Sequence, residues 1–164
     1  MPNDCEAYLD IETTGLSPES CHITVIGIQL GVGSNNRFVQ LVGDNITGDS
    51  VLAALSGVEV IYTYNGSRFD LPFINCRLGI RLDKLFNHRD LMYDCWNNNL
   101  YGGLKAVERQ LGIGRQWTGI DGLDAINLWW RYINYSDSIA LRTLLAYNKE
   151  DVSNLGVLKD RLIG

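Results

Sequence analysis

The sequence has little basic charge and no long apolar run, and each shortage excludes a class of protein. Its 164 residues contain 14 Lys and Arg against 19 Asp and Glu, which gives a formal net charge of −5. This balance argues against a protein that grips long nucleic acid through a basic surface. No run approaches the ~18 apolar residues of a membrane span, so we expect no membrane interaction. If the chain handles nucleic acid, a local site must do it.

Cysteine and histidine are also scarce, with four and two residues. No two cysteines form a C-x-x-C pair, so the sequence predicts neither a zinc site nor a disulfide framework. We interpret the four cysteines as buried thiols: Cys5, Cys21, Cys76 and Cys95. Residues 1–4 lack the basic and apolar regions of a signal peptide. We therefore expect a soluble, cytoplasmic protein.

The chain shows no repeat, linker or low-complexity segment, and 46% of its residues are hydrophobic. A chain of this length can bury roughly 70% of the surface that it exposes when unfolded. We therefore expect one globular domain over residues 1–164, large enough to hold a rigid site.

The distribution of apolar residues predicts an α/β fold with a mixed five-stranded sheet flanked by helices. Three strand-like runs separated by turn residues predict an antiparallel meander, and the later strands alternate with helices. The expected strands are 7–11, 23–30, 37–42, 58–64 and 90–96. The expected helices are 50–55, 71–78, one between the glycines of GGLKAVERQLGIG, and a long C-terminal one over 136–162.

Two acids lie inside the first strand, in the segment YLDIETTGLSP. Because side chains alternate along a strand, Asp10 and Glu12 share one face while Leu9 and Ile11 point to the other. Two carboxylates buried together raise each other's pKa and require a positive group nearby. The alternative is an edge strand with a solvated acidic face.

The C-terminal helix carries a polar pair within an apolar arc. Tyr147 and Asp151 are four residues apart and stack on one face, so a hydroxyl and a carboxylate can address the same point. Asp151 could instead mark a place where the arc frays. The arc itself consists of Leu144, Leu155, Leu158 and Leu162.

A fourth acid, Asp70, follows a predicted strand and turn and comes just before Leu71 and Pro72. Aspartate is a favoured N-cap and proline is tolerated in the first helical turn, so capping alone would explain it. If the four carboxylates meet, they suit hard cations such as Mg²⁺ and Mn²⁺. Two such ions can stabilise both the attacking and the leaving oxygen of a phosphoryl displacement.

Three segments, DIETTG, YNGSRFD and YNKED, resemble motifs I, II and III of the DEDD superfamily of 3′-to-5′ exonucleases. That superfamily has the ribonuclease H-like fold and includes the proofreading domains of DNA polymerases. The motifs occur in family order over nearly the whole chain. Tyr147 marks the DEDDy branch, because the DEDDh branch would have histidine at position 146, where this chain has alanine. The pattern is most similar to stand-alone ribonuclease H-like predicted exonucleases of bacteria and archaea.

The resemblance implies a role for each motif residue. Asp10 would bridge two divalent ions, Mg²⁺ or Mn²⁺. Glu12 and Asp151 would complete the shell of the first ion, and Asp70 would hold the second, largely through water. Tyr147 would orient the attacking water by a hydrogen bond.

The resemblance also implies contacts with the end of a substrate strand. Thr13 and Leu16 would touch the terminal 3′ hydroxyl and the last base, although Leu16 could equally pack on the core. Asn65 would lie beside the terminal nucleotide, or it could be a plain turn residue. Lys105 and Arg109 share one helical face and could contact phosphate. A face exposed to solvent is the favoured interpretation.

A group of aromatic residues in the C-terminal third could stack bases or form a dimer surface. Packing between helices and core is the favoured interpretation. The group consists of Trp117, Trp129, Trp130, Tyr132 and Tyr135.

We therefore expect a metal-dependent 3′-to-5′ exonuclease that releases nucleoside 5′-monophosphates from a single-stranded DNA or RNA end. One alternative is a nuclease-like module that binds nucleic acid or a partner protein without turnover. Another is an endonuclease of the same fold. The small basic surface favours help from a partner subunit or a homo-oligomer, and the sequence does not distinguish DNA from RNA.

Overall fold

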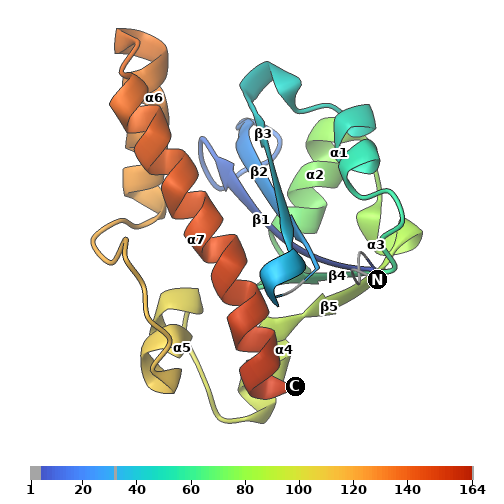
Figure 1. The fold of residues 1–164 in the computed structure, drawn as a ribbon. Coiled ribbons are helices and arrows are strands. Elements are labelled where there is room, and N and C mark those ends of the chain that lie inside the picture. The colour runs from blue at the N-terminus through green and yellow to red at the C-terminus, as the bar shows by residue number, and fades with distance from the viewer. Residues whose placement is uncertain (1–4, 32, 164) are drawn as a thin grey trace.

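The computed structural model describes residues 5–31 and 33–163. Within them the chain forms a five-stranded sheet in the order β3-β2-β1-β4-β5 (Figure 1). Strands β1, β2 and β3 pair antiparallel, whereas β4 runs parallel to β1 and β5 parallel to β4. The predicted mixed sheet with its antiparallel meander is confirmed. The strands are β1 (Glu6–Thr13), β2 (Ile23–Leu30), β3 (Arg37–Val42), β4 (Val60–Thr63) and β5 (Asn87–Asp90).

Helices cover both faces of this sheet. Figure 1 shows the long helix α7 crossing one face, with α1 and α2 on the opposite side. None of the helices in the described part of the chain is long and apolar enough to cross a membrane. The helices are α1 (Gly48–Ala54), α2 (Asp70–Leu78), α3 (Leu82–Leu85), α4 (Leu91–Asn97), α5 (Leu104–Leu111), α6 (Gly122–Tyr135) and α7 (Ser138–Leu162), with two short 3₁₀ turns, η1 (Gly33–Asn35) and η2 (Gly43–Asn45).

The predicted fifth strand at 90–96 is wrong, because β5 ends where that range begins and α4 follows at once. Asp90 causes the switch: its carboxylate accepts a hydrogen bond from the Met92 N–H and caps α4. Leu91 and Cys95, four residues apart, then bury one face of the helix. The strand itself reads NHRD and pairs only with β4 at the sheet edge, so it has no apolar signature.

The prediction of four buried thiols is also wrong. Cys95 is buried in the core and Cys21 is half-buried, but Cys5 and Cys76 are exposed. No pair of them forms a disulfide in the described part of the chain. The cysteines therefore have no shared structural role.

The core is divided by the sheet into two layers. Leu9 and Ile11 of β1 pack with the apolar faces of α1 and α2. Tyr8 packs on the other side with Leu155 and Leu158 of α7. Because β1 contributes to both layers, its position is fixed from both sides, and a polar group placed on it is held rigidly.

Candidate active site

The central strand β1 presents its two acids to the layer that α7 covers. Tyr8 points into that layer, so the alternation of side chains places Asp10 and Glu12 on the same side. β1 has neighbours on both edges, and Glu12 is only 8% exposed. The alternative of an edge strand with a solvated acidic face is therefore wrong.

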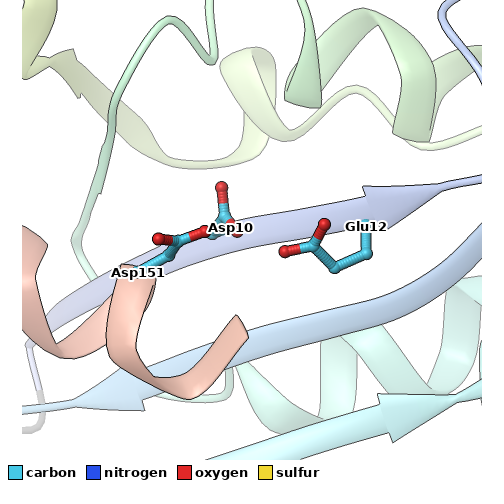
Figure 2. Close-up of side chains that lie close together, drawn as sticks. All are labelled: Asp10, Glu12 and Asp151. Carbon is cyan, nitrogen blue, oxygen red and sulfur yellow. The ribbon is translucent and has the colours of Figure 1, made fainter. Parts of the chain in front are cut away.

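Asp151 of α7 joins these two acids. Carboxylate oxygens of Asp10, Glu12 and Asp151 all lie within 4.8 Å of one another. Figure 2 shows the three side chains gathered between β1 and α7. Asp151 is itself buried, one turn from the buried Tyr147. It is therefore an inward-facing acid and not a fraying point of the apolar arc.

Asp70 reaches the same region from the first turn of α2. Its Oδ2 atom accepts a hydrogen bond from the Ile11 N–H at 3.1 Å, and its side chain is buried. The N-cap of α2 is Phe69, and no side chain caps this helix. The capping interpretation is therefore wrong, because the carboxylate of Asp70 ties α2 to β1 at the residue between Asp10 and Glu12.

Burial raises the pKa of each of the four acids, and the neighbouring carboxylates add to the effect. The pKa of Glu12 is raised to about 8 and that of Asp70 to about 7. Burial and the charge of Asp151 hold the pKa of Asp10 well above 3.8. The pKa of Asp151 is raised by burial to about 6, although Arg115 opposes the rise. The set can ionise together only beside balancing cations.

Arg115 supplies one such cation, and the sequence analysis did not identify it. Its guanidinium makes two hydrogen bonds to Glu108, at 2.7 and 2.9 Å, and another to Asp151. Glu150 lies 3.7 Å away from the same group. The sequence analysis expected a positive group beside the acids, which indicated that such a residue exists. With 14 Lys and Arg in the chain, that signal could not select it.

Asn148 is a second residue that the sequence analysis missed. Its amide nitrogen donates to Asp10, at 3.2 Å from the backbone oxygen and 3.3 Å from Oδ2. The amide oxygen accepts a hydrogen bond from Gln40 of β3 at 3.0 Å, which fixes the orientation of the side chain. Asn148 therefore holds Asp10 in place from α7.

The donor set fits a hard divalent cation. Glu12 Oε1 is buried and accepts no hydrogen bond from any described residue. A buried oxygen without a donor is costly, and a cation would satisfy it. The converging ligands are all carboxylate oxygens, with neither sulfur nor imidazole among them. This chemistry suits Mg²⁺ or Mn²⁺ better than zinc or copper.

Tyr147 stands at the edge of the acid cluster. Burial and the charge of Asp151 raise its pKa above the ordinary value, so its hydroxyl stays protonated at neutral pH. The Lys105 ammonium lies 4.7 Å from the centre of the tyrosine ring. Lys105 is therefore half-buried against the site, whereas Arg109 on the same helix is exposed as expected.

A cavity of about 440 Å³ opens beside the carboxylates. Its polar wall contains Asp10, Glu12 and Tyr147, and its apolar wall includes Phe69 and Leu16. Leu16 is 84% exposed, so the alternative that it packs on the core is wrong. The remaining lining residues are Ile11, Thr13, Gly15, Gly122, Leu123, Ile126 and Asp151.

Asn65 lies in the turn between β4 and α2 and has a positive φ of 60°. Its backbone N–H donates to Asp90 Oδ1 at 2.8 Å, and its own Oδ1 is buried without a donor among the described residues. Asp90 Oδ2 also accepts hydrogen bonds from the backbone and hydroxyl of Ser67. Asn65 is thus a turn residue held by Asp90, and its free amide oxygen can still accept a bond from a ligand.

Comparison with solved structures places this fold among polymerases and nucleases. The family B DNA polymerase of the archaeon Pyrobaculum calidifontis matches with a TM-score of 0.69 and 18% identity, over 96% of this chain and 24% of the polymerase. A nuclease in its apo form matches with a TM-score of 0.66 and 18% identity, over 98% of this chain and 72% of that one. Brucella melitensis NrnC bound to pGG matches with a TM-score of 0.64 and 20% identity, over 98% of this chain and 73% of NrnC.

The TM-scores establish a shared fold, and at identities of 18–20% they establish no more than that. The chain spans only a small part of the polymerase, but nearly three quarters of the apo nuclease and of NrnC. No curated protein matches the sequence. A family model described as the RNase H superfamily matches residues 7–163, which is almost the whole chain. The chain therefore belongs to the RNase H superfamily.

Proposed function

We propose that this protein is a metal-dependent 3′-to-5′ exonuclease that releases nucleoside 5′-monophosphates from single-stranded DNA or RNA. The observation that carries the proposal is the meeting of Asp10, Glu12, Asp151 and Tyr147 at one cavity, with Asp70 hydrogen-bonded to the β1 backbone between the first two acids. They come from β1, α2 and α7, so the fold brings together groups that lie far apart in the sequence. The apo nuclease, which has the same fold, supports it.

The acids would hold two divalent ions. Asp10, Glu12 and Asp151, whose oxygens converge, would hold the first ion, and Asp70 would help Asp10 to hold the second. Such a pair of ions, when bound, stabilises the attacking and leaving oxygens of the displacement. Arg115 then has a balancing role, since it keeps part of the negative charge compensated before metals arrive.

The cavity would receive the terminal nucleotide of the strand. Its apolar wall of Phe69 and Leu16 suits a base and a sugar, while Thr13 offers a hydroxyl for the 3′ end. Tyr147 would orient a water for attack on phosphorus by hydrogen bonding to it. The new bond forms between water oxygen and phosphorus as the P–O3′ bond breaks. The products are a nucleoside 5′-monophosphate and a strand with a new 3′ hydroxyl.

The first test is hydrolysis of 5′-labelled oligonucleotides with Mg²⁺ or Mn²⁺. The wild-type protein should shorten the labelled strand stepwise from its 3′ end and release unlabelled mononucleotides. Asp10→Ala should lose this activity. Asp49→Ala is the matched control, because Asp49 is an exposed acid on α1 outside the site. Equal activity in the wild type and Asp10→Ala would disprove the assignment.

Direction and end requirement need separate substrates. An oligonucleotide blocked with a 3′ phosphate and a circular single strand should both resist cleavage if the enzyme needs a free 3′ hydroxyl. Cleavage of the circle would indicate an endonuclease instead. Matched DNA and RNA strands, compared in the same assay, test the sugar preference. Gel filtration with and without the strand tests for a homo-oligomer, which would add to the small basic surface.

One observation favours a second function, a binding module without turnover. Arg115 donates a hydrogen bond to one carboxylate oxygen of Asp151 and so competes with a metal for that side chain. If Arg115 never releases it, the protein would bind a strand without cleaving it. Electron paramagnetic resonance of bound Mn²⁺ separates the two functions: an exonuclease binds Mn²⁺ at the acids, whereas the binding module leaves it free.

A further inference from the structure

A second cavity, of about 450 Å³, lies at the end of β2, apart from the acids. Thr14 lines it, and the preceding Thr13 lines the catalytic cavity, so the two hollows adjoin at the end of β1. Its volume is in the range of sites for small organic ligands. The cavity is therefore close enough to the proposed active site to serve the same strand.

Two tryptophans of α6 form one wall of this cavity. Trp130 is 40% exposed, while Trp129 is half-buried and packs over the backbone of Gly43, where an added Cβ would lie 3.4 Å from the indole. The favoured interpretation of packing between helices and core is thus wrong for Tyr135, which is 80% exposed, while Trp130 packs with only part of its indole. An indole at a cavity wall suits stacking with a nucleic-acid base, whatever its sequence.

The remaining walls offer groups for the rest of a nucleotide. Arg77, at the end of α2, has its guanidinium nitrogen 3.0 Å from Nδ1 of His22, and both residues are exposed. A guanidinium held in this way suits phosphate. The Asp44 carboxylate, which also lines the cavity, is an acceptor for the amino group of a base.

Thr24 gives an independent indication of a ligand. It lies on β2, lines the cavity and is 1% exposed. Its hydroxyl makes no hydrogen bond to any residue that the structure describes. A buried hydroxyl normally has a partner, because leaving it unpaired costs free energy. A ligand in the cavity would supply that partner.

We propose that this cavity binds a nucleoside monophosphate unit, with its base against Trp130 and Trp129 and its phosphate on Arg77. The choice of ligand class rests on the proposed function. The unit can be a nucleotide of the substrate strand outside the active site or a released mononucleotide. Both have the same chemistry, so the experiment must separate them.

The first experiment measures binding without catalysis. Adenosine 5′-monophosphate and a single-stranded oligonucleotide of about ten residues are titrated by calorimetry into the protein in EDTA. We expect Arg77→Gln and Trp130→Leu to weaken binding about tenfold, and Thr24→Val by several-fold without loss of thermal stability. Arg131→Gln is the control, because Arg131 carries the same charge on α6 and does not line the cavity.

The two ligands identify the source. If Arg77→Gln weakens binding of the mononucleotide, the cavity accepts a free product. If it weakens only the oligonucleotide, the cavity holds a unit of the strand. If neither ligand binds, or if all three cavity variants bind both ligands like the wild type, the proposal is wrong.

A kinetic experiment separates this proposal from the proposed function. With Mn²⁺, Arg77→Gln should raise KM for the oligonucleotide, or relieve inhibition by the mononucleotide. It should leave hydrolysis of thymidine 5′-(4-nitrophenyl phosphate) unchanged, because that substrate reaches only the acids. If the wild type hydrolyses neither substrate, yet binding in EDTA depends on Arg77, the cavity is a nucleotide site and the exonuclease assignment fails.

Discussion

The guanidinium of Arg115 donates a hydrogen bond to the carboxylate of Asp151 while making two more to Glu108. Arg115 is thus shared between the acid cluster and a structural partner. Its side chain and that of Glu108 are 4% and 2% exposed. A buried pair of this kind contributes little net stability, but removal of one member leaves an uncompensated charge.

We expect Arg115→Met to lower the free energy of unfolding by about 3–5 kcal/mol, because Glu108 remains buried without its partner. Urea unfolding of the metal-free protein measures the change. The double variant Arg115→Met/Glu108→Leu should recover most of the loss. An unchanged unfolding midpoint in the single variant would show that the pair carries no such cost.

The pH dependence of stability should follow from the raised pKa values of the acids. In the folded protein these pKa values are about 6 to 8, whereas in the unfolded chain they lie near 4. At pH values between these limits the folded protein therefore binds more protons than the unfolded chain. Their contribution to stability is therefore complete below about pH 4 and is lost as the pH rises toward 8. We expect the melting temperature in EDTA to fall between about pH 5 and 8.

Glu12→Gln provides the control for this pH dependence, because it removes one titrating group and should flatten the curve. Added Mn²⁺ should also reduce the fall, since metal binds the ionised acids of the folded state. A melting temperature that stays level or rises over this range in EDTA would contradict the raised pKa values.

Tyr147→Phe should lower kcat by about 10²–10⁴-fold and leave Mn²⁺ affinity unchanged. The variant keeps the buried ring, so stability should change by less than about 0.5 kcal/mol. Single-turnover rates and Mn²⁺ titration are the measurements. A loss of metal affinity equal to the loss of rate would place Tyr147 in the metal shell instead.

Asp90→Asn should destabilise the turn that carries Asn65. The carboxylate of Asp90 accepts bonds from the backbones of Asn65, Ser67 and Met92, and an amide cannot accept them all. We expect a loss of about 2–4 kcal/mol in unfolding free energy. KM should rise by more than kcat falls if Asn65 contacts the substrate. Asp94→Asn, at an exposed ion pair on α4, is the control and should change little.

Gly27→Ala should separate α7 from β2. An added Cβ would lie 2.2 Å from Asn148 Oδ1 and 2.9 Å from Val152, so the side chain that holds Asp10 must move. Both stability and activity should fall. Gly156→Ala is the matched control on the same interface: its Cβ would lie 3.5 Å from Gln29, and alanine favours the helix, so it should be neutral or stabilising. Circular dichroism melting and the nuclease assay compare the two.

The two elements with a strong period could be predicted from the sequence. The alternation of side chains along β1 predicted that Asp10 and Leu9 point to opposite faces of the sheet. The helical period of α7 predicted that Tyr147 and Asp151 lie on the same face of the helix. Both predictions depend on a local apolar period, which arises because one face of the strand or helix packs in the core. The assignment of these residues as catalytic remains a prediction.

The contacts between distant segments could not be predicted in this way. Arg115 lies in the connection between α5 and α6, where no period determines the direction of a side chain. Asn148 meets Asp10 only because α7 crosses β1. The error at β5 had a different cause: a capping bond to Asp90 outweighed the strand-like residues that follow it.

The order in which the acids occur along the chain has a consequence for synthesis. Asp10 is made near the start, whereas Asp151 and the amide that steadies Asp10 come with α7, more than a hundred positions later. A nascent chain that has not yet released residues 138–162 from the ribosome lacks both. If the proposed activity is correct, it would therefore begin only after residues 138–162 have docked on the sheet.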